Sequence, residues 1–146
     1  MKKLLVLLIL MVITIGSVVP VLAQTSSASA CTGTEGLSPG YWKNHLEDWP
    51  KGAEPGWGPY ACFNHAVFHV GPCKSLIDVL NTGGGGEKAF DRQAVAALLN
   101  ATSPLGLDFH SLGWVQGIVQ DAYRTKNWDY YKNILEAANN MGVAGN

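Results

Sequence analysis

Basic residues, long apolar runs and cysteine are all scarce in this 146-residue chain. Only 14% of its residues are charged, with 10 Lys and Arg against 11 Asp and Glu. No cluster of Lys or Arg supplies the basic patch that nucleic acid or an anionic membrane surface attracts. We therefore expect neither of these as a partner.

Strand-like alternation and nucleophile motifs are also missing. No segment sustains the two-residue period of a half-buried strand, so the sequence predicts an all-α fold. No Gly-x-Ser-x-Gly motif occurs, and no matched acid, base and nucleophile stand out. We therefore predict no catalytic residues, and a small secreted hydrolase is only a third hypothesis. Four serines are typical of helix caps or turns: Ser38, Ser75, Ser103 and Ser111.

The one long apolar run lies at the N-terminus. Lys2 and Lys3 precede an apolar stretch from Leu4 to Ile15, and the small residue Ala23 suits cleavage before Gln24. Residues 1–23 are therefore predicted to be a signal peptide, with an uncleaved membrane anchor as the alternative. Cleavage leaves eight basic residues against eleven acidic ones, and we expect no membrane insertion afterwards. The predicted location is extracellular or at the cell surface.

The rest of the chain divides into a linker and one domain. Residues 24–37 are rich in Ser, Thr, Ala and Gly, which is typical of a flexible linker. Residues 38–146 are predicted to form a compact single domain of five to six short helices with long loops rich in aromatic residues, Gly and Pro. The expected helices are 39–48, 72–81, 87–100, 112–125 and 128–141, and segment 61–70 fits either a helix or an extended piece.

The segment from Glu87 to Asn100 has the strongest helical pattern. Its apolar residues recur on one face, which predicts the central helix of the domain. Gly83–Gly86 precedes it, and no Gly-Lys-Ser/Thr follows, so we expect a helix end and a turn rather than a phosphate loop. Asn100-Ala101-Thr102 matches an N-glycosylation acceptor, although an asparagine at this place also suits a structural cap.

Aromatic and polar side chains gather at the start of the first predicted helix. Ser38-Pro39 is a helix-start signal, and Gly40-Tyr41-Trp42-Lys43-Asn44-His45 follows it at once. The stretch is either a buried clasp or a recognition edge. Aromatic rings beside amides suit stacking on sugars, so a glycan is one expected ligand class. The candidate binding residues are Tyr41, Trp42, Lys43, Asn44, His45, Trp49, Trp57 and Tyr60.

This opening stretch resembles a group of secreted bacterial and archaeal modules that begin with Gly-Tyr-Trp-Lys-Asn-His and have no established activity. The resemblance extends to Gly83–Gly86, to Ala94–Ala101 and to the Asn-rich final helix, and it covers most of the chain from Cys31 onward. Such modules often begin and end with a cysteine. Here the tail reads Met141-Gly142-Val143-Ala144, so a disulfide from Cys31 to the C-terminus is not expected within this chain.

Cysteine and histidine also form a cluster with metal-ligand spacing. Cys62, His65, His69 and Cys73 could hold zinc or copper, because His65 and His69 would share a helix face. In an oxidising compartment, however, a Cys62–Cys73 disulfide is preferred, and no cofactor is then expected. That pairing would leave Cys31 for an intermolecular disulfide, while pairing of Cys31 with either of the others is the alternative.

These observations predict a secreted or cell-surface helical module that acts by binding or assembly. Its expected partner is a component of the cell surface or extracellular matrix, either a glycan or a protein. The alternative is an extracellular metal-binding protein that uses the Cys/His cluster.

Overall fold

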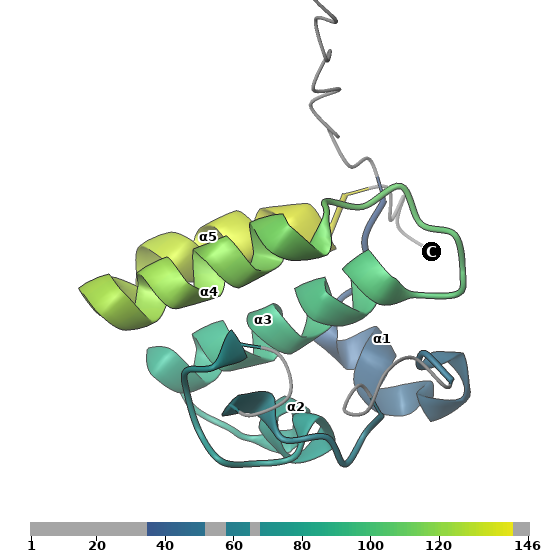
Figure 1. Cartoon of the computed structure of the whole chain (residues 1–146), viewed down its shortest axis with the longest axis horizontal. Helices are drawn as coiled ribbons and strands as arrows, with labels where there is room; N and C mark the ends of the chain where they lie inside the picture. Colours follow the sequence, from purple (N-terminus) through teal and green to yellow (C-terminus); the bar gives the residue numbers. More distant parts are fainter. Residues whose placement is uncertain (1–34, 52–57, 65–67, 142–146) are drawn as a thin grey trace, which may run out of the picture.

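The computed structural model describes residues 35–51, 58–64 and 68–141. Within these ranges the chain forms five α-helices and one 3-10 turn, and it forms no strand beyond an isolated bridge between Cys62 and Ser75 (Figure 1). The all-α prediction is therefore confirmed. The elements are α1 (Pro39–Asn44), η1 (Leu46–Asp48), α2 (Leu76–Asn81), α3 (Glu87–Thr102), α4 (Leu112–Thr125) and α5 (Trp128–Asn139).

Three helices begin at a serine. The backbones of these serines are extended, and each side chain accepts a hydrogen bond from the amide three residues later. Such a cap gives a partner to an amide that the helix leaves without one, and it typically stabilises a helix by about 1 kcal/mol. The capping residues are Ser38 for α1, Ser75 for α2 and Ser111 for α4.

The first two helices are clearly shorter than predicted, and α5 ends two residues early, at Asn139. The helix expected over 39–48 breaks at His45, whose backbone is not helical (φ −127°, ψ 66°), and continues as η1. The helix expected from Pro72 begins at Leu76 instead. Residues just before it pair with the preceding segment, since Phe63 N–H donates to the carbonyl of Lys74 and Leu76 N–H donates to that of Ala61, both at 2.9 Å. Those backbone groups are therefore not available to a longer helix.

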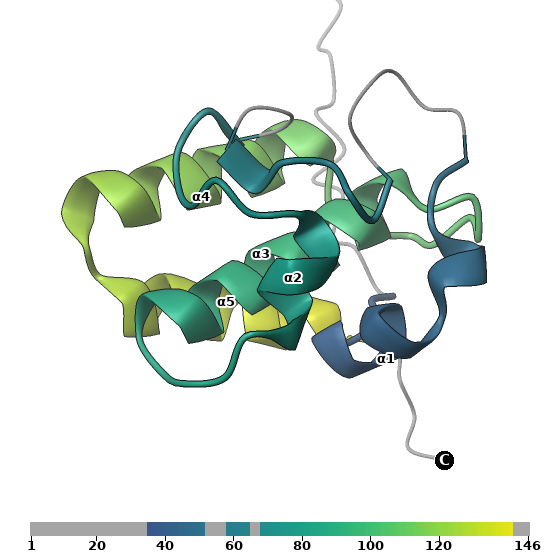
Figure 2. The ribbon, with the colours of Figure 1, turned by 90° about the horizontal axis from the view of Figure 1, so that it is seen from below.

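Helix α3 is the centre of the domain, as its periodicity predicted. It lies between α4 and α5 on one side and α1 and α2 on the other (Figure 1). Seen from below, α2 crosses α3 (Figure 2). Nine of the sixteen residues of α3 are buried: Phe90, Asp91, Ala94, Val95, Ala96, Ala97, Leu98, Leu99 and Asn100. The small alanines let neighbouring helices approach closely, which is why one helix can contact all the others.

The first described residues are hydrogen-bonded to the end of the last helix and to the segment before α4. Gly36 N–H donates to the carbonyl of Met141 at 2.7 Å, and Glu35 N–H donates to that of Asp108 at 3.1 Å. A Cβ atom on Gly36 would lie 2.4 Å from the carbonyl oxygen of Ala138, so only glycine fits this crossing. Residues 35–37, which the composition assigned to the linker, are thus hydrogen-bonded into the domain. Residues 24–34 lie outside the described residues.

A glycine-rich turn joins α2 to α3. Gly84 and Gly86 have φ values of 102° and 59°, in the region that favours glycine. The guanidinium of Arg92 donates to the carbonyls of Thr82 (2.8 Å) and Gly84 (3.0 Å). Carbonyl groups of the turn therefore point toward a cation, as expected of a helix connection and not of a phosphate loop.

Candidate functional site

Trp42 is the structural centre of the Gly40–His45 motif. Its ring is fully buried, and its indole N–H donates to Oδ1 of Asn100 in α3 at 2.9 Å. The backbone carbonyl of Trp42 in turn accepts the indole N–H of Trp49 at 2.9 Å, and Trp49 is only 2% exposed. Both tryptophans therefore hold α1 and η1 on the core. Neither of these two predicted binding residues presents its ring to a ligand.

Asn100 joins three parts of the chain. Its Oδ1 also accepts from Leu37 N–H (2.9 Å), while its Nδ2 donates to the carbonyl of Leu37 (3.0 Å) and to Oδ1 of Asn139 (2.9 Å). Asn139 Nδ2 continues the network to the backbone and side-chain oxygens of Gln93. Asn100 is 2% exposed, so its amide is a structural hub and is inaccessible to glycosylation in the folded domain.

Tyr41 and His45 form the outer edge of the motif. Their rings stack with centroids 4.2 Å apart and an interplanar angle of 10°, and both residues are half-buried. The Tyr41 hydroxyl donates to the Asp48 carboxylate, and this hydrogen bond, helped by partial burial, raises the pKa of Tyr41 to about 12. The pair thus offers a small, rigid aromatic surface.

The remaining predicted binding residues are scattered. Lys43 and Asn44 are exposed, but the Asn44 amide donates to the carbonyl of Gly40 at 2.9 Å. Tyr60 is 85% exposed and lies on the other side of an undescribed segment. Trp57 lies outside the described residues. The eight residues therefore do not form one continuous aromatic face in the described part of the molecule.

The predicted Cys/His cluster is brought together only in part. The sulfur atoms of Cys62 and Cys73 lie 3.5 Å apart, well beyond the roughly 2.05 Å of a disulfide bond. His69 adopts a left-handed backbone (φ 57°), and its N–H donates to the carbonyl of Asn64. His65 lies outside the described residues, as does Cys31. Among the residues that are described, no group of three or more His, Cys, Asp or Glu is placed to hold a metal ion.

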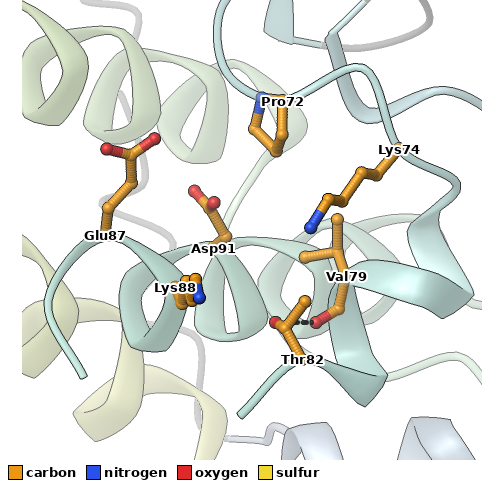
Figure 3. A pocket seen from close by; sticks show the side chains of 7 residues that line it. All are labelled: Pro72, Lys74, Val79, Thr82, Glu87, Lys88 and Asp91. Carbon is orange, nitrogen blue, oxygen red and sulfur yellow. Dashed lines mark hydrogen bonds between the residues drawn. The ribbon is translucent and has the colours of Figure 1, made fainter. Parts of the chain in front are cut away.

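A cavity of about 280 Å³ lies between the segment before α2, α2 itself and the start of α3 (Figure 3). Helix α3 contributes both acids, because Glu87 and Asp91 are four residues apart and share a face. The cavity is lined by Pro72, Lys74, Val79, Thr82, Glu87, Lys88 and Asp91. It combines an apolar wall with two acids and two amines.

Asp91 is the most unusual residue of this pocket. It is 4% exposed, and its Oδ1 accepts the hydroxyl of Tyr123 at 2.7 Å. Burial disfavours the carboxylate and raises the pKa of Asp91 to about 6, despite the opposing effects of the Tyr123 hydrogen bond and of Lys74. Burial, and then the hydrogen bond to Asp91, raise the pKa of Tyr123 as well. A carboxyl group with a perturbed pKa inside a cavity is typical of a functional site.

The wall that carries Lys74 is held in place by close packing. Gly71 has φ 95°, and a Cβ atom there would lie 2.5 Å from the Phe63 ring and 2.8 Å from the Tyr123 hydroxyl. The carbonyl of Gly71 accepts a hydrogen bond from the Asn64 amide at 2.9 Å. The Gly71–Lys74 segment is therefore fixed against the same tyrosine that holds Asp91.

Sequence reasoning did not identify Asp91. Its position contains a signal nonetheless, because Asp91 precedes Val95 by four residues and Leu98 by seven. It therefore falls on the buried face of α3, where a charged residue is unusual. Lys74 gave no comparable signal, since only the fold of the segment before α2 brings it to the cavity.

Comparisons with models of protein families, with curated proteins and with solved structures found no match for this chain. Within the described ranges, no helix combines the length and apolar character needed to cross a membrane. The function must therefore be inferred from the site itself.

Proposed function

We propose that this protein is a helical binding module that works outside the cell and takes a small ligand into the pocket beside Asp91. The observation that supports this most directly is a nearly buried carboxyl group that lines a cavity with an apolar wall. A volume of about 280 Å³ is close to the lower end of the usual range for small-molecule sites, roughly 300–1,000 Å³.

Binding is better supported than catalysis. The hydroxyl of Thr82 donates to the backbone carbonyl of Val79 at 2.6 Å, so it is occupied as a helix cap. The other lining residues include no serine, cysteine or histidine that could act as a nucleophile. The two lysines and two acids instead suit recognition of a charged or strongly polar molecule.

The extracellular location rests on the leader-like residues 1–23 and on the resemblance to secreted modules. In an oxidising compartment we expect Cys62 and Cys73 to form a disulfide, because their sulfur atoms need to approach by only about 1.5 Å. Cys31 would then remain for a bond to a second molecule. A cell-surface or matrix component is the expected partner of such an assembly.

Amide-resolved NMR titration of the mature chain tests the pocket as the ligand site. A library of small amines, carboxylates, amino acids and neutral sugars is added to ¹⁵N-labelled protein. We expect at least one class to shift the amide signals of Lys74, Val79 and Lys88 saturably, while those of Lys43 and Asn44 stay unchanged. If no compound shifts the pocket signals, the pocket is not the ligand site.

A second candidate function is partner binding at the Tyr41–His45 edge. Lys43 and Leu46 are near the stacked residues in sequence, and both are exposed, Leu46 to 43%. They could add charged and apolar contacts. Titration with cello-, chito- and xylo-oligosaccharides distinguishes this edge from the pocket. A glycan that binds here would shift the signals of Lys43 and Leu46 and leave Lys74 unaffected.

A further inference from the structure

We infer that the pocket binds a small zwitterion, namely an α-amino acid with a compact apolar side chain. This inference rests on the proposed function, since it names the ligand class of the same pocket. The argument uses the acid at the base of the cavity, the amines at its rim and the apolar wall between them.

Asp91 forms no ion pair with a residue of the described ranges. The two ion pairs within 4.0 Å among the described residues are Arg124–Asp121 and Lys132–Glu136, and Asp91 belongs to neither. Lys74 and Arg92 lower the pKa of Asp91, but burial outweighs both. A hydrogen-bonded ammonium group would offset this burial penalty. Tyr123 already fixes one carboxylate oxygen, so the acceptor is oriented before a ligand arrives.

The two amines at the rim form no ion pair with a described residue either. Lys74 and Lys88 are exposed, and neither takes part in an ion pair within the described ranges. The Lys74 side chain extends from the opposite wall toward the space above Val79, facing the side of the cavity that holds Asp91 (Figure 3). A carboxylate bound there would lie near a positive charge while the ammonium group of the same ligand reaches Asp91.

The space between the charges is small and apolar. Val79 is 1% exposed, and Pro72 lies across the cavity from it in Figure 3. A branched aliphatic side chain would contact both residues, and the cavity volume of about 280 Å³ excludes a large ligand.

Ligands with a single charge fit this arrangement less well. An amine without a carboxylate would approach Lys74 and Lys88 uncompensated, and a carboxylate without an amine would approach Glu87 and Asp91. Only a molecule with both charges places each beside a group of opposite sign.

Isothermal titration calorimetry at pH 7.5 on the mature chain provides the test. L-valine is compared with isobutylamine, which lacks its carboxylate, and with isovalerate, which lacks its amine. We expect valine to bind at least about tenfold more tightly than either analogue. Asp91→Asn should weaken valine binding by a similar factor. Lys74→Gln should weaken the binding of valine but not that of isobutylamine.

Exposed residues away from the pocket supply matched controls. Asp129→Asn on α5 and Lys51→Gln after η1 remove charges of the same two signs and should leave valine affinity unchanged. Valine affinity should also fall from pH 7.5 to pH 5 in the wild type, because Asp91, with a pKa of about 6, becomes protonated. The fall should be absent in Asp91→Asn.

Two outcomes would overturn the inference. If isobutylamine binds as tightly as valine, the pocket does not recognise a carboxylate. If Asp91→Asn leaves valine affinity unchanged, Asp91 does not bind the ammonium group. The proposed function fails separately, when no compound of any class shifts the pocket amides. A sugar or a simple anion that shifts them while valine does not would leave the pocket as a ligand site and refute only the zwitterion.

Discussion

Asn100 accepts the indole N–H of Trp42 at 2.9 Å, across 58 residues of sequence. This bond links the first helix of the domain to the C-terminal end of the central one. Asn100 also bonds both backbone groups of Leu37 and the side chain of Asn139. One buried amide therefore connects α1, α3, α5 and residues 35–37, the N-terminal strap. The Gly-Tyr-Trp-Lys-Asn-His motif is therefore first an architectural element.

Replacing Trp42 by Phe should destabilise the domain by about 0.5–1.5 kcal/mol beyond the effect of lost volume. The substitution keeps an aromatic ring but removes one hydrogen bond to Asn100 Oδ1, which still accepts the Leu37 N–H. Chemical denaturation followed by circular dichroism measures the change. Trp114→Phe is the control, because the half-buried Trp114 indole forms no hydrogen bond within the described residues. Equal losses in both variants would mean that the Asn100 bond contributes nothing.

Two glycine substitutions should change the stability of the domain in opposite directions. Gly36→Ala places a methyl group 2.4 Å from the Ala138 carbonyl, so the strap or α5 must shift and Tm should fall. Gly117→Ala lies in exposed helical backbone of α4, where an added Cβ meets nothing within 4 Å. It should stabilise the domain by about 0.5–1 kcal/mol through helix propensity. Thermal unfolding of the pair checks both signs, and a tolerated Gly36→Ala would show that the strap is not closely packed.

Leu98→Ala should cost about 2–5 kcal/mol, because Leu98 is fully buried in the central helix and its truncation leaves a cavity. Leu105→Ala is the matched control: Leu105 is 44% exposed, and its truncation should change the free energy of unfolding by less than about 0.5 kcal/mol. Urea denaturation of both variants measures the difference. Similar values would contradict the central position of α3.

Asp91 should make the domain less stable as pH rises through 6. Its pKa is raised in the fold from 3.8 to about 6, so between these values the folded state binds more protons than the unfolded state. Stability then falls with rising pH, by about 2–3 kcal/mol for a shift of this size. The loss of stability is complete above about pH 6 and absent below about pH 4.

Asp91→Asn isolates this contribution. The variant keeps an oxygen acceptor for Tyr123 and should be more stable than the wild type at pH 7.5, but equal to it near pH 4. Tm measured from pH 4 to pH 8 for both proteins gives the comparison, with Asp129→Asn as a control for loss of an exposed acid. A constant difference across this range would show that Asp91 does not titrate with a raised pKa.

Much of the fold could be predicted because its signals are local. Serine caps and the apolar spacing of α3 depend on residues within a few positions of one another, so α3, α4 and the start of α1 were identified closely. The start of α2 was missed, since backbone pairing of Phe63 with Lys74 competes with a helical turn there. Distant residues decide that competition.

The sequence determined in part which residues between Tyr41 and His45 are buried and which lie at the outer edge. Helical geometry alone places Tyr41 and His45 on one face and Trp42 on another. Which face is buried depended on Asn100, which lies far along the chain. The aromatic residues Trp42 and Trp49 thus serve the core and not a ligand, although the sequence allowed either role.

By itself, the sequence determined the helical class and the central place of α3. Only the tertiary structure brought Lys74, from the segment before α2, to the cavity beside Asp91 and placed the Tyr123 hydroxyl within hydrogen-bond distance of that carboxylate. These residues are separated by up to 49 positions, and no periodicity within one segment encodes their meeting. The pocket is therefore a property of packing: its charges face each other because Gly71 and α4 hold the walls in place, and the amino-acid order alone does not reveal it.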